Sequence, residues 1–254
     1  MRLTLLAASL VLATLAGCAS TGGAGSSDVR AVLANPARSQ ADRERDLRDR
    51  PDQVLALARF KRGDTVADIL SGGGYYAEIL SGIVGPRGKV LLVNNPGYEA
   101  FGRKGLAERL AGDRLPNVTH LSGPTEALGM GEGVLDGAVI VMSYHDLYWV
   151  DEKEGWPKVD AGQFLDQVVR ALKPGGVLLV VDHSARAGTG SSAAQTLHRI
   201  DEQFAIADFR KHGLDWEAAI PILRNEADDR SKPVFDPSIR GKTDRFVHLY
   251  RKPG

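Results

Sequence analysis

Apolar runs of strand length alternate with helix-length segments from Arg62 onward. This alternation is typical of repeated strand and helix units that build a parallel sheet with helices on both of its faces. Runs such as AVIVM and VLLVV are almost wholly apolar, as expected of strands that are buried on both faces. The pattern predicts parallel strands at Thr65–Leu70, Lys89–Val93, Val118–Leu121, Ala138–Met142 and Val177–Val181. Helices are predicted between them at Tyr76–Val84, Tyr98–Leu110 and Gly162–Leu172.

The tail of the chain has a different pattern. It predicts a long helix from Ser192 to His212, a strand at Trp216–Leu223, a polar loop and a last strand at Arg245–Tyr250. A helix followed by two strands joined by a loop indicates that the sheet finishes in an antiparallel pair. We therefore predict one α/β domain over residues 40–254, with a Rossmann-like, mostly parallel seven-stranded sheet, helices on both faces and an antiparallel C-terminal strand.

Residues 40–59 carry alternating charges and then an apolar helical pattern that Pro51 interrupts, which predicts a pair of lead-in helices. The simplest interpretation of the charges is a solvated helix face. The alternative is that Arg45 or Arg48 closes over a bound ligand.

The segment from Val66 to Tyr76, VADILSGGGYY, joins the first predicted strand to the next helix through a run of glycines. Without a Cβ the turn can be tight, and a ligand can approach the backbone and the positive end of the helix. This order of strand, turn and helix predicts a site for a nucleotide-type cofactor. A sharp turn without any ligand is the alternative.

Polar residues follow four of the predicted strands at the edge where ligands bind to open parallel sheets. They are Ser71-Gly72-Gly73-Gly74-Tyr75, Asn94-Asn95, Ser143-Tyr144-His145-Asp146 and Asp182-His183. Because the carboxyl ends of parallel strands meet at one edge, the sequence predicts a pocket there.

The first residues indicate export. Arg2 precedes an apolar run from Leu3 to Leu15, which is too short to span a bilayer as a stable helix. The run ends in LAGC, which resembles the lipobox of bacterial lipoproteins and implies cleavage of residues 1–17 and lipidation of Cys18. We therefore expect a flexible tether at residues 18–39 and a protein that is lipid-anchored to the cell envelope on its periplasmic side. A plain signal peptide with an incidental cysteine, or a buried N-terminal helix, is the alternative.

Charge and cysteine content disfavour one class of partner and exclude one kind of covalent link. Lys plus Arg and Asp plus Glu both number 32, so no overall field favours nucleic acid as a partner. Cys18 is the one cysteine of the chain, and an intramolecular disulfide is therefore excluded.

Taken together, these motifs resemble the class I S-adenosylmethionine-dependent methyltransferases from about Pro51 to the C-terminus. The resemblance is carried by VADILSGGGYY, DGAVIVMSYHD and ALKPGGVLLVVDH, which are similar to the family's first motif, fourth strand and fifth strand. GGGYY, SYHDLYW, LHRID, LRNEADD and FDPSIRGKTDRF resemble, more narrowly, a little-characterised bacterial methyltransferase-like group. The resemblance implies binding of S-adenosyl-L-methionine and transfer of its methyl group to an acceptor.

Carried over residue by residue, the resemblance implies a cofactor site. Its predicted members are Asp68, Ser71, Gly72, Gly73, Gly74 and Tyr75 around the methionine part, and Asn94 at the ribose. The sequence departs from the family at Leu70, where the motif has glycine, and at Asn94, where it has an acid. Glu126 lies near, but not at, the position where the family often contacts adenine.

Methyl transfer needs a positioned acceptor and often a base, for which His145, Asp146 and His183 are the candidates. The alternative for each histidine is a hydrogen-bonded structural role. His198 and Asp201 lie three apart on a predicted helix. These residues and the two histidines include no pair with a recognised metal-ligand spacing, so no metal site is predicted.

Two further groups have open interpretations. The aromatic residues Tyr144, Tyr148 and Trp149 line an acceptor pocket or cap adenine, or else pack in the core. The charged residues Asp236, Arg240, Asp244 and Arg245 form a lid, or, as we prefer, an ion-pair network that fixes a long loop.

The sequence thus predicts a methyltransferase that acts on a small molecule or a cell-envelope acceptor. The alternative is a lipoprotein that keeps the fold but has lost the reaction, as Leu70 and Asn94 would permit. An NAD-linked oxidoreductase is disfavoured because GGG is not GxGxxG and no acid follows the second strand. A serine hydrolase is disfavoured because LSGGG lacks the GxSxG pattern.

Overall fold

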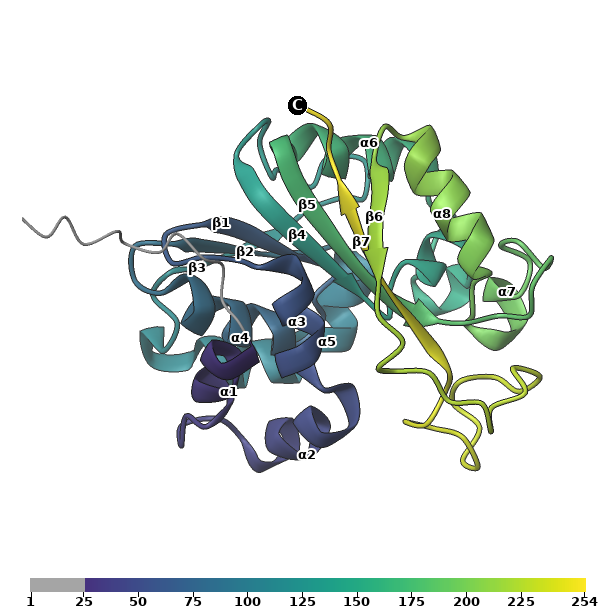
Figure 1. The fold of residues 1–254 in the computed structure, drawn as a ribbon, viewed down its shortest axis with the longest axis horizontal. Coiled ribbons are helices and arrows are strands. Elements are labelled where there is room, and N and C mark those ends of the chain that lie inside the picture. Colours follow the sequence, from purple (N-terminus) through teal and green to yellow (C-terminus); the bar gives the residue numbers. More distant parts are fainter. Residues whose placement is uncertain (1–25) are drawn as a thin grey trace, which may run out of the picture.

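The computed structural model describes residues 26–254, which fold around one seven-stranded sheet (Figure 1). The strand order is β3-β2-β1-β4-β5-β7-β6. The strands are β1 (Thr65–Ile69), β2 (Lys89–Asn94), β3 (Val118–Ser122), β4 (Leu135–Val141), β5 (Leu172–His183), β6 (Asp215–Ala219) and β7 (Arg245–Arg251). β1 to β5 are parallel, and β7 is antiparallel to both β5 and β6. The predicted fold class is confirmed.

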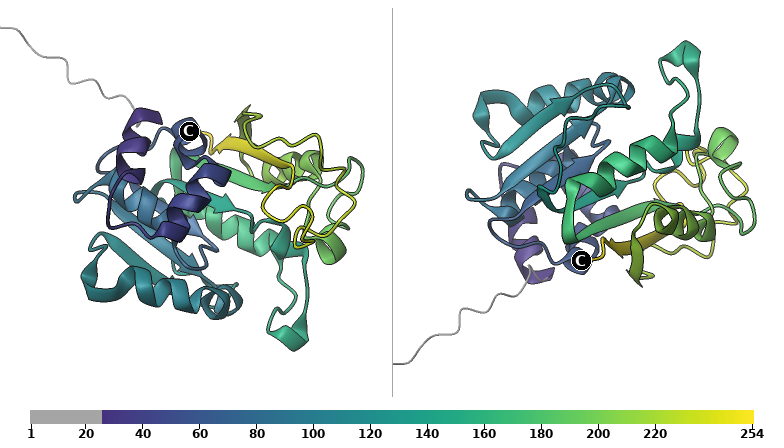
Figure 2. Two further views of the ribbon diagram at one scale, coloured as in Figure 1. Left: turned by 90° about the horizontal axis from the view of Figure 1, so that it is seen from below. Right: turned by 90° about the horizontal axis from the view of Figure 1, so that it is seen from above.

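Helices cover both faces of the sheet (Figure 2). They are α1 (Ser26–Leu33), α2 (Gln40–Asp49), α3 (Pro51–Ala58), α4 (Tyr75–Val84), α5 (Pro96–Leu110), α6 (Ala161–Ala171), α7 (Ala194–Leu197) and α8 (Glu202–Lys211), with 3-10 turns η1 (Ala111–Asp113), η2 (His145–Tyr148) and η3 (Glu152–Glu154). Alternate residues of β1 enter two hydrophobic cores: Ala67 and Ile69 one, Val66 the other. Burial on both faces explains the almost wholly apolar runs in the sequence.

One reversal of the strand order positions the site. The chain proceeds outward from β1 to β2 and β3, then returns to place β4 on the other side of β1. The order therefore reverses between β1 and β4, and the loops that follow these strands diverge there. In open parallel sheets this is the place where ligands bind.

The N-terminal helices differ from the prediction in two ways. The predicted tether at 18–39 is wrong from residue 26 onward, because α1 lies there, with Val29 fully buried and Val32 against Gly82 of α4. The predicted solvated face of 40–59 holds only in part: Arg43, Glu44 and Arg48 are exposed, but Asp42 and Asp49 are buried in ion pairs. The lead-in helix pair itself is confirmed as α2 and α3.

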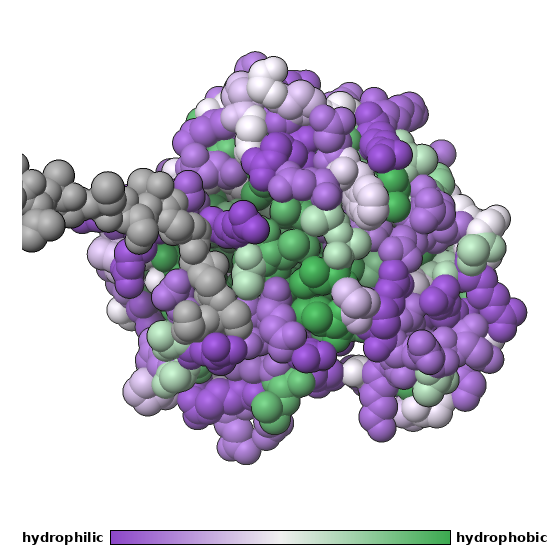
Figure 3. Space-filling model, in the orientation of Figure 1, coloured by the Kyte–Doolittle hydropathy of each residue, from purple (hydrophilic) through white to green (hydrophobic). Residues whose placement is uncertain are grey.

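The predicted signal peptide and Cys18 lie outside the described residues. Within residues 26–254, none of the helices has the length and apolar character needed to span a bilayer. Figure 3 shows one face of the molecule as mostly hydrophilic, with apolar atoms gathered near its centre.

The predicted long helix 192–212 is wrong, because the chain leaves the helical conformation between α7 and α8. His198 has a φ of 52°, and Ile200 then hydrogen-bonds to the backbone of His183 and Ala185 beside β5. The Asp201 side chain begins α8 by accepting from the Gln203 N–H. The apolar periodicity does not show this break, since Ile200 is buried against the strand end and not on a helix face.

Two strand limits also differ from the prediction. β6 ends at Ala219 and not at Leu223, with a bulge between Trp216 and Ala218. β5 begins at Leu172, so the predicted KPGG turn is part of this strand, where its pairing with β4 is irregular.

Candidate functional site

The glycine turn is shaped by positive φ angles. Leu70, Gly72 and Gly74 have φ values of 53°, 57° and 80°, and Gly74 is the N-cap of α4. Glycine adopts this conformation without cost, whereas a side chain with a Cβ is strained by about 1–2 kcal/mol. The backbone of Leu70 is therefore strained, at the position where the methyltransferase family that the sequence resembles has glycine.

Asp68 fixes this turn from beneath. Its carboxylate accepts hydrogen bonds from the Ser71 hydroxyl and, at 2.8 Å, from the Ala77 N–H. Burial raises the pKa of Asp68 to about 6, against the smaller opposing effect of these hydrogen bonds. The predicted pair Asp68 and Ser71 is brought together, and it braces the loop.

Asn94 clamps the same turn from β2. Its Oδ1 accepts from the Gly72 N–H at 2.9 Å, and its Nδ2 donates to the Gly72 carbonyl at 3.0 Å. The side chain is fully buried, which differs from the expectation that it faces a ribose. The next residue, Asn95, instead lines the cavity described below and caps α5 through the Tyr98 N–H.

A second pair of glycines holds the turn from α5. A Cβ built on Gly102 would lie 2.3 Å from the Gly72 carbonyl carbon, and one on Gly105 would lie 3.1 Å from the Gly73 Cα. The sequence reasoning missed these two positions. Their signal was two glycines three apart inside a predicted helix, where glycine is otherwise unfavourable.

Tyr75, predicted to contact the cofactor, is buried at the start of α4. Its hydroxyl donates to Asp46 at 2.7 Å, and the Arg45 guanidinium lies 3.9 Å from the centre of its ring. Arg45 also pairs with Asp49 at 2.7 Å. The lead-in helix α2 therefore packs on the turn through a cation and an aromatic ring.

A cavity of about 150 Å³ lies where the loops after β1, β2, β3 and β4 converge. Its lining is mixed, with aromatic walls and a few polar groups. The lining residues are Leu70, Asn95, Pro96, Gly97, Tyr98, Pro124, Thr125, Glu126, Asp146, Leu147, Trp149, Gly155, Trp156, Pro157 and Val159. Trp149 and Glu126 are thus placed at the cavity, whereas Tyr144 and Tyr148 donate to Asp208 away from it.

His145 lies between two carboxylates at the end of β4. Its Nδ1 is 2.7 Å from Asp182 Oδ1, its backbone N–H donates to Asp182 Oδ2 at 2.8 Å, and its Nε2 is 3.2 Å from Asp146 Oδ1. Burial lowers the pKa of His145, but the charges and hydrogen bonds of Asp146 and Asp182 outweigh burial and raise it to about 10. Asp146 also accepts from the Tyr98 hydroxyl, a contact that the sequence did not reveal.

His183 is close to His145 but turns to another partner. The two ring centres are 5.7 Å apart, and His183 Nδ1 is 2.7 Å from the Thr243 hydroxyl. Burial and the positive charges of His145, Arg245 and Arg199 lower the pKa of His183 well below its usual range. His183 is therefore a neutral, hydrogen-bonded neighbour of the His145 group.

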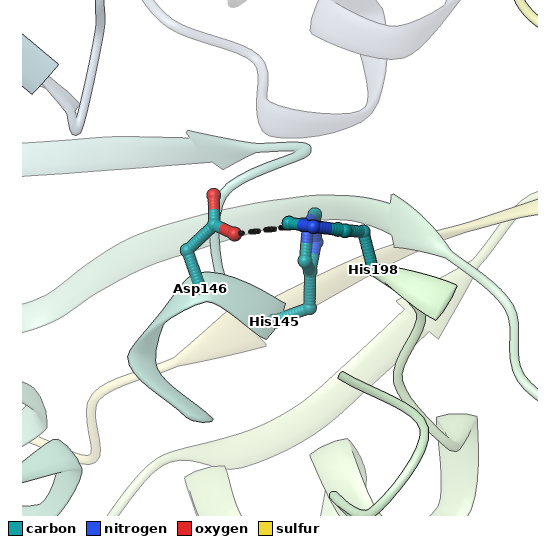
Figure 4. Close-up of side chains that lie close together, drawn as sticks. All are labelled: His145, Asp146 and His198. Atoms are coloured by element: carbon teal, nitrogen blue, oxygen red, sulfur yellow. Dashed lines mark ion pairs between the residues drawn. The ribbon is translucent and has the colours of Figure 1, made fainter. Parts of the chain in front are cut away.

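His198 joins the group, whereas Asp201 does not. His198 Nδ1 lies 3.5 Å from Asp146 Oδ1, as Figure 4 shows. The Asp201 carboxylate instead accepts from the N–H groups of Gly188 and Gln203. The break between α7 and α8 separates the two residues that the sequence placed on one helix face.

The loop before β7 is held by ion pairs to buried carboxylates, as the preferred interpretation predicted. Asp244 lies 2.9 Å from Arg230 and 3.4 Å from Arg224, and Arg245 lies 2.8 Å from Asp49. The other two members of the predicted network differ. The Asp236 side chain accepts from Ser238 in the same loop, and Arg240 donates its backbone N–H to the Asp236 carbonyl.

Comparison with known proteins adds sequence relatives over half the chain. No protein-family model matches the sequence. The ubiquinone/menaquinone biosynthesis C-methyltransferase UbiE of Hahella chejuensis is 30% identical over 125 residues, 49% of this chain and 45% of that protein. The UbiE of Salmonella arizonae is 34% identical over 132 residues, 52% and 47% of the two chains. The chain thus spans about half the length of the curated relatives it matches.

Solved structures share the fold over almost the whole chain. A SAM-dependent methyltransferase from Aquifex aeolicus has a TM-score of 0.56 at 18% identity, covering 90% of this chain and 98% of its own. The [4+2]-cyclase SpnF has a TM-score of 0.58 at 18% identity, covering 93% and 89%. At this identity the likeness shows the fold alone, a Rossmann-like sheet that this chain shares with these solved proteins.

Proposed function

We propose that this protein is an S-adenosyl-L-methionine-dependent methyltransferase that acts on a small-molecule or cell-envelope acceptor. The observation that carries the proposal is the cavity at the point where the strand order reverses, next to a glycine turn that opens α4. The methyltransferase relatives over half of the chain support the same activity.

The residues around the cavity fit this cofactor. Tyr98, Trp149 and Trp156 provide aromatic surfaces for a purine ring, and Asn95 and Thr125 provide polar groups at its rim. With a volume of about 150 Å³ the cavity is smaller than the ~300–1,000 Å³ usual for drug-sized ligands, so it suits the base more than the whole cofactor.

The methionine part fits the glycine turn. The turn starts at Leu70, which lines the cavity, and the N-terminus of α4 that follows the turn favours a carboxylate. When bound, the cofactor supplies an electrophilic methyl group on a sulfonium ion.

Asp146 is the residue best placed to orient an acceptor, because it belongs both to the cavity wall and to the His145 group. Burial raises the pKa of Asp146, but the positive charge of His145 and the hydrogen bonds of Asp146 with His145, His198 and Tyr98 outweigh burial and lower it. Asp146 is therefore an anion that accepts a hydrogen bond. His145, held as an imidazolium by Asp182, is a positioning residue for that carboxylate. His183 acts one step further away, through its contact with His145.

Calorimetric titration with S-adenosylhomocysteine tests the proposal. We expect wild-type protein to bind, and Gly72→Arg to bind at least tenfold more weakly, because a side chain there is strained at a φ of 57° and points at Phe101 and at Tyr98, which lines the cavity. Gly112→Arg is the matched control: Gly112 also has a positive φ, of 63°, but nothing lies within 4 Å of a Cβ at this position. No binding by wild-type protein, or equal binding by both variants, would contradict the proposal.

The alternative, a binding protein that keeps this fold without methyl transfer, is favoured by the strained Leu70 inside the motif. SpnF, a cyclase by its name, illustrates that this fold is not tied to one reaction. Incubating a cell-envelope extract with protein and S-adenosylmethionine labelled in its methyl group distinguishes the two. A labelled product that Gly72→Arg fails to form supports the enzyme, whereas binding without any product supports the alternative.

We also propose that the chain is exported and anchored through a lipid on Cys18, on the basis of the sequence LAGC. Metabolic labelling with an alkyne fatty acid tests this directly. We expect label on the wild-type chain and none on Cys18→Ser, and an unlabelled wild-type chain would contradict the anchor.

A further inference from the structure

Three potential metal ligands converge beside the cavity. His145, Asp146 and His198 each offer one ligand atom, and these atoms all lie within 4.8 Å of one another. His145 and Asp146 come from η2, after β4, and His198 comes from the end of α7, so their convergence is a product of the tertiary fold (Figure 4).

The two separations that involve Asp146 match the edges of a coordination polyhedron, and the third, between the two histidines, is no more than 4.8 Å. Asp146 Oδ1 lies 3.2 Å from His145 Nε2 and 3.5 Å from His198 Nδ1. A metal ion at its usual ~2.1 Å from each ligand atom places neighbouring ligands ~3.0 Å apart in octahedral and ~3.4 Å apart in tetrahedral geometry. We propose that His145 Nε2, His198 Nδ1 and Asp146 Oδ1 bind one divalent transition-metal ion.

The groups behind the ligands orient them as expected for such a site. Asp182 engages His145 Nδ1 at 2.7 Å, which directs Nε2 toward the ion. Tyr98 donates to Asp146 Oδ2 and leaves Oδ1 for the metal. The ion replaces the proton on His145 Nε2, which passes to the solvent.

His198 is held in place by its backbone and by aromatic contacts. Its φ of 52° is a left-handed conformation that costs a residue with a Cβ about 1–2 kcal/mol. Such strain concentrates at functional sites. Its ring lies 4.7 Å from that of Trp149 and 5.0 Å from that of Phe235, centre to centre.

The donor set and its place indicate what the ion does. Two imidazoles and one carboxylate suit Zn²⁺, Co²⁺ or Fe²⁺ better than Mg²⁺ or Ca²⁺. Three protein ligands leave coordination positions open, and Asp146 lies in the cavity wall. Resting on the proposed function, the inference is that the acceptor carries an oxygen, as in a phenol or an enol. The ion binds that oxygen and lowers its pKa.

Metal uptake by the full-length chain tests the site. Protein stripped with a chelator is titrated with Zn²⁺ in a calorimeter, and we expect one ion per chain. Asp146→Asn and His198→Gln should each weaken binding at least tenfold. Asp182→Asn weakens the contact that orients the His145 ring and should lower Zn²⁺ affinity about 10- to 100-fold.

His120→Gln is the matched control, because His120 pairs with Glu99 at 2.9 Å on the rim of the molecule, in a histidine–carboxylate contact outside the site. Its Zn²⁺ affinity should equal that of wild-type protein. Equal affinity for His198→Gln and His120→Gln would overturn the inference, as would less than a tenth of an ion per wild-type chain.

A second readout needs no variant to fold. Four-coordinate Co²⁺ absorbs visible light more strongly than the free six-coordinate ion. Wild-type protein that shows neither this absorption nor retention of Co²⁺ after gel filtration overturns the site. The same protein is also titrated with S-adenosylhomocysteine. Binding of this ligand without metal uptake refutes the metal site alone, whereas metal uptake without such binding refutes the proposed function alone.

Discussion

Gly102→Ala changes a single methyl group at the contact between α5 and the glycine turn. In an ordinary helix this change stabilises the protein by about 0.8–1.0 kcal/mol, because alanine is the better helix former. Here the new Cβ would lie 2.3 Å from the Gly72 carbonyl carbon and 2.7 Å from the Gly73 nitrogen. Since carbon atoms in contact prefer ~3.5–4.0 Å, helix and turn must separate by ~1 Å.

Overpacking of this kind costs about 1–3 kcal/mol. The new methyl group would meet backbone atoms of the turn, which cannot move aside as a flexible side chain can, so we expect Gly102→Ala to lie at the upper end of this range. After the gain in helix propensity, we expect the free energy of unfolding to fall by about 2 kcal/mol. The displaced turn should also weaken S-adenosylhomocysteine binding, by about tenfold or more, since a shift of ~1 Å removes precise positioning. Urea denaturation gives the first quantity and calorimetric titration the second.

Gly105→Ala is the control on the same helix, with its Cβ 3.1 Å from the Gly73 Cα. A shift of a few tenths of an ångström relieves this contact, so its stability should stay within ~0.5 kcal/mol of wild type as the propensity gain offsets the crowding. If Gly102→Ala proves as stable as Gly105→Ala and binds as tightly, the argument from this contact is refuted.

Three further results are expected. Burial raises the pKa of Asp68 from 3.8 to about 6, so the folded state holds the proton longer than the unfolded state, and stability falls as the pH rises from about 4 to 6. The fall in the free energy of unfolding between about pH 4 and 6 is on the order of 3 kcal/mol and can be measured by urea denaturation. Asp68→Asn should remove this pH dependence, whereas the control Asp215→Asn, at an exposed position, should retain it. Leu70→Gly should relieve the backbone strain and widen the cavity, so we expect S-adenosylhomocysteine to bind more tightly. Loss of the buried leucine side chain should lower the free energy of unfolding by ~1–2 kcal/mol. Weaker binding would contradict the strain argument. Arg199→Met should destabilise the protein by about 3–5 kcal/mol, because Arg199 pairs at 2.8 Å with the buried Asp228, whose carboxylate is left unpaired. Arg186→Met, in the exposed pair with Asp229, should change stability by less than ~0.5 kcal/mol, and equal effects of the two changes would refute the distinction.

Local pattern determined much of the fold. The five parallel strands, the glycine turn at Gly72 and the antiparallel last strand are all legible in the sequence, because a strand buried on both faces must be apolar and a tight turn needs glycine. The convergence of the polar residues at the strand ends was also predictable, because the carboxyl ends of parallel strands lie at one edge of the sheet.

Only the tertiary structure decided which partners those polar residues contact. Asn94 follows its strand as a ligand-binding residue would, yet its amide closes on Gly72, 22 residues earlier. His198 reaches His145 because the helix breaks beside β5, and helical periodicity cannot show a break that a distant strand imposes. Contacts between segments far apart in the chain depend on tertiary packing, and the spacing of residues along the sequence does not predict them.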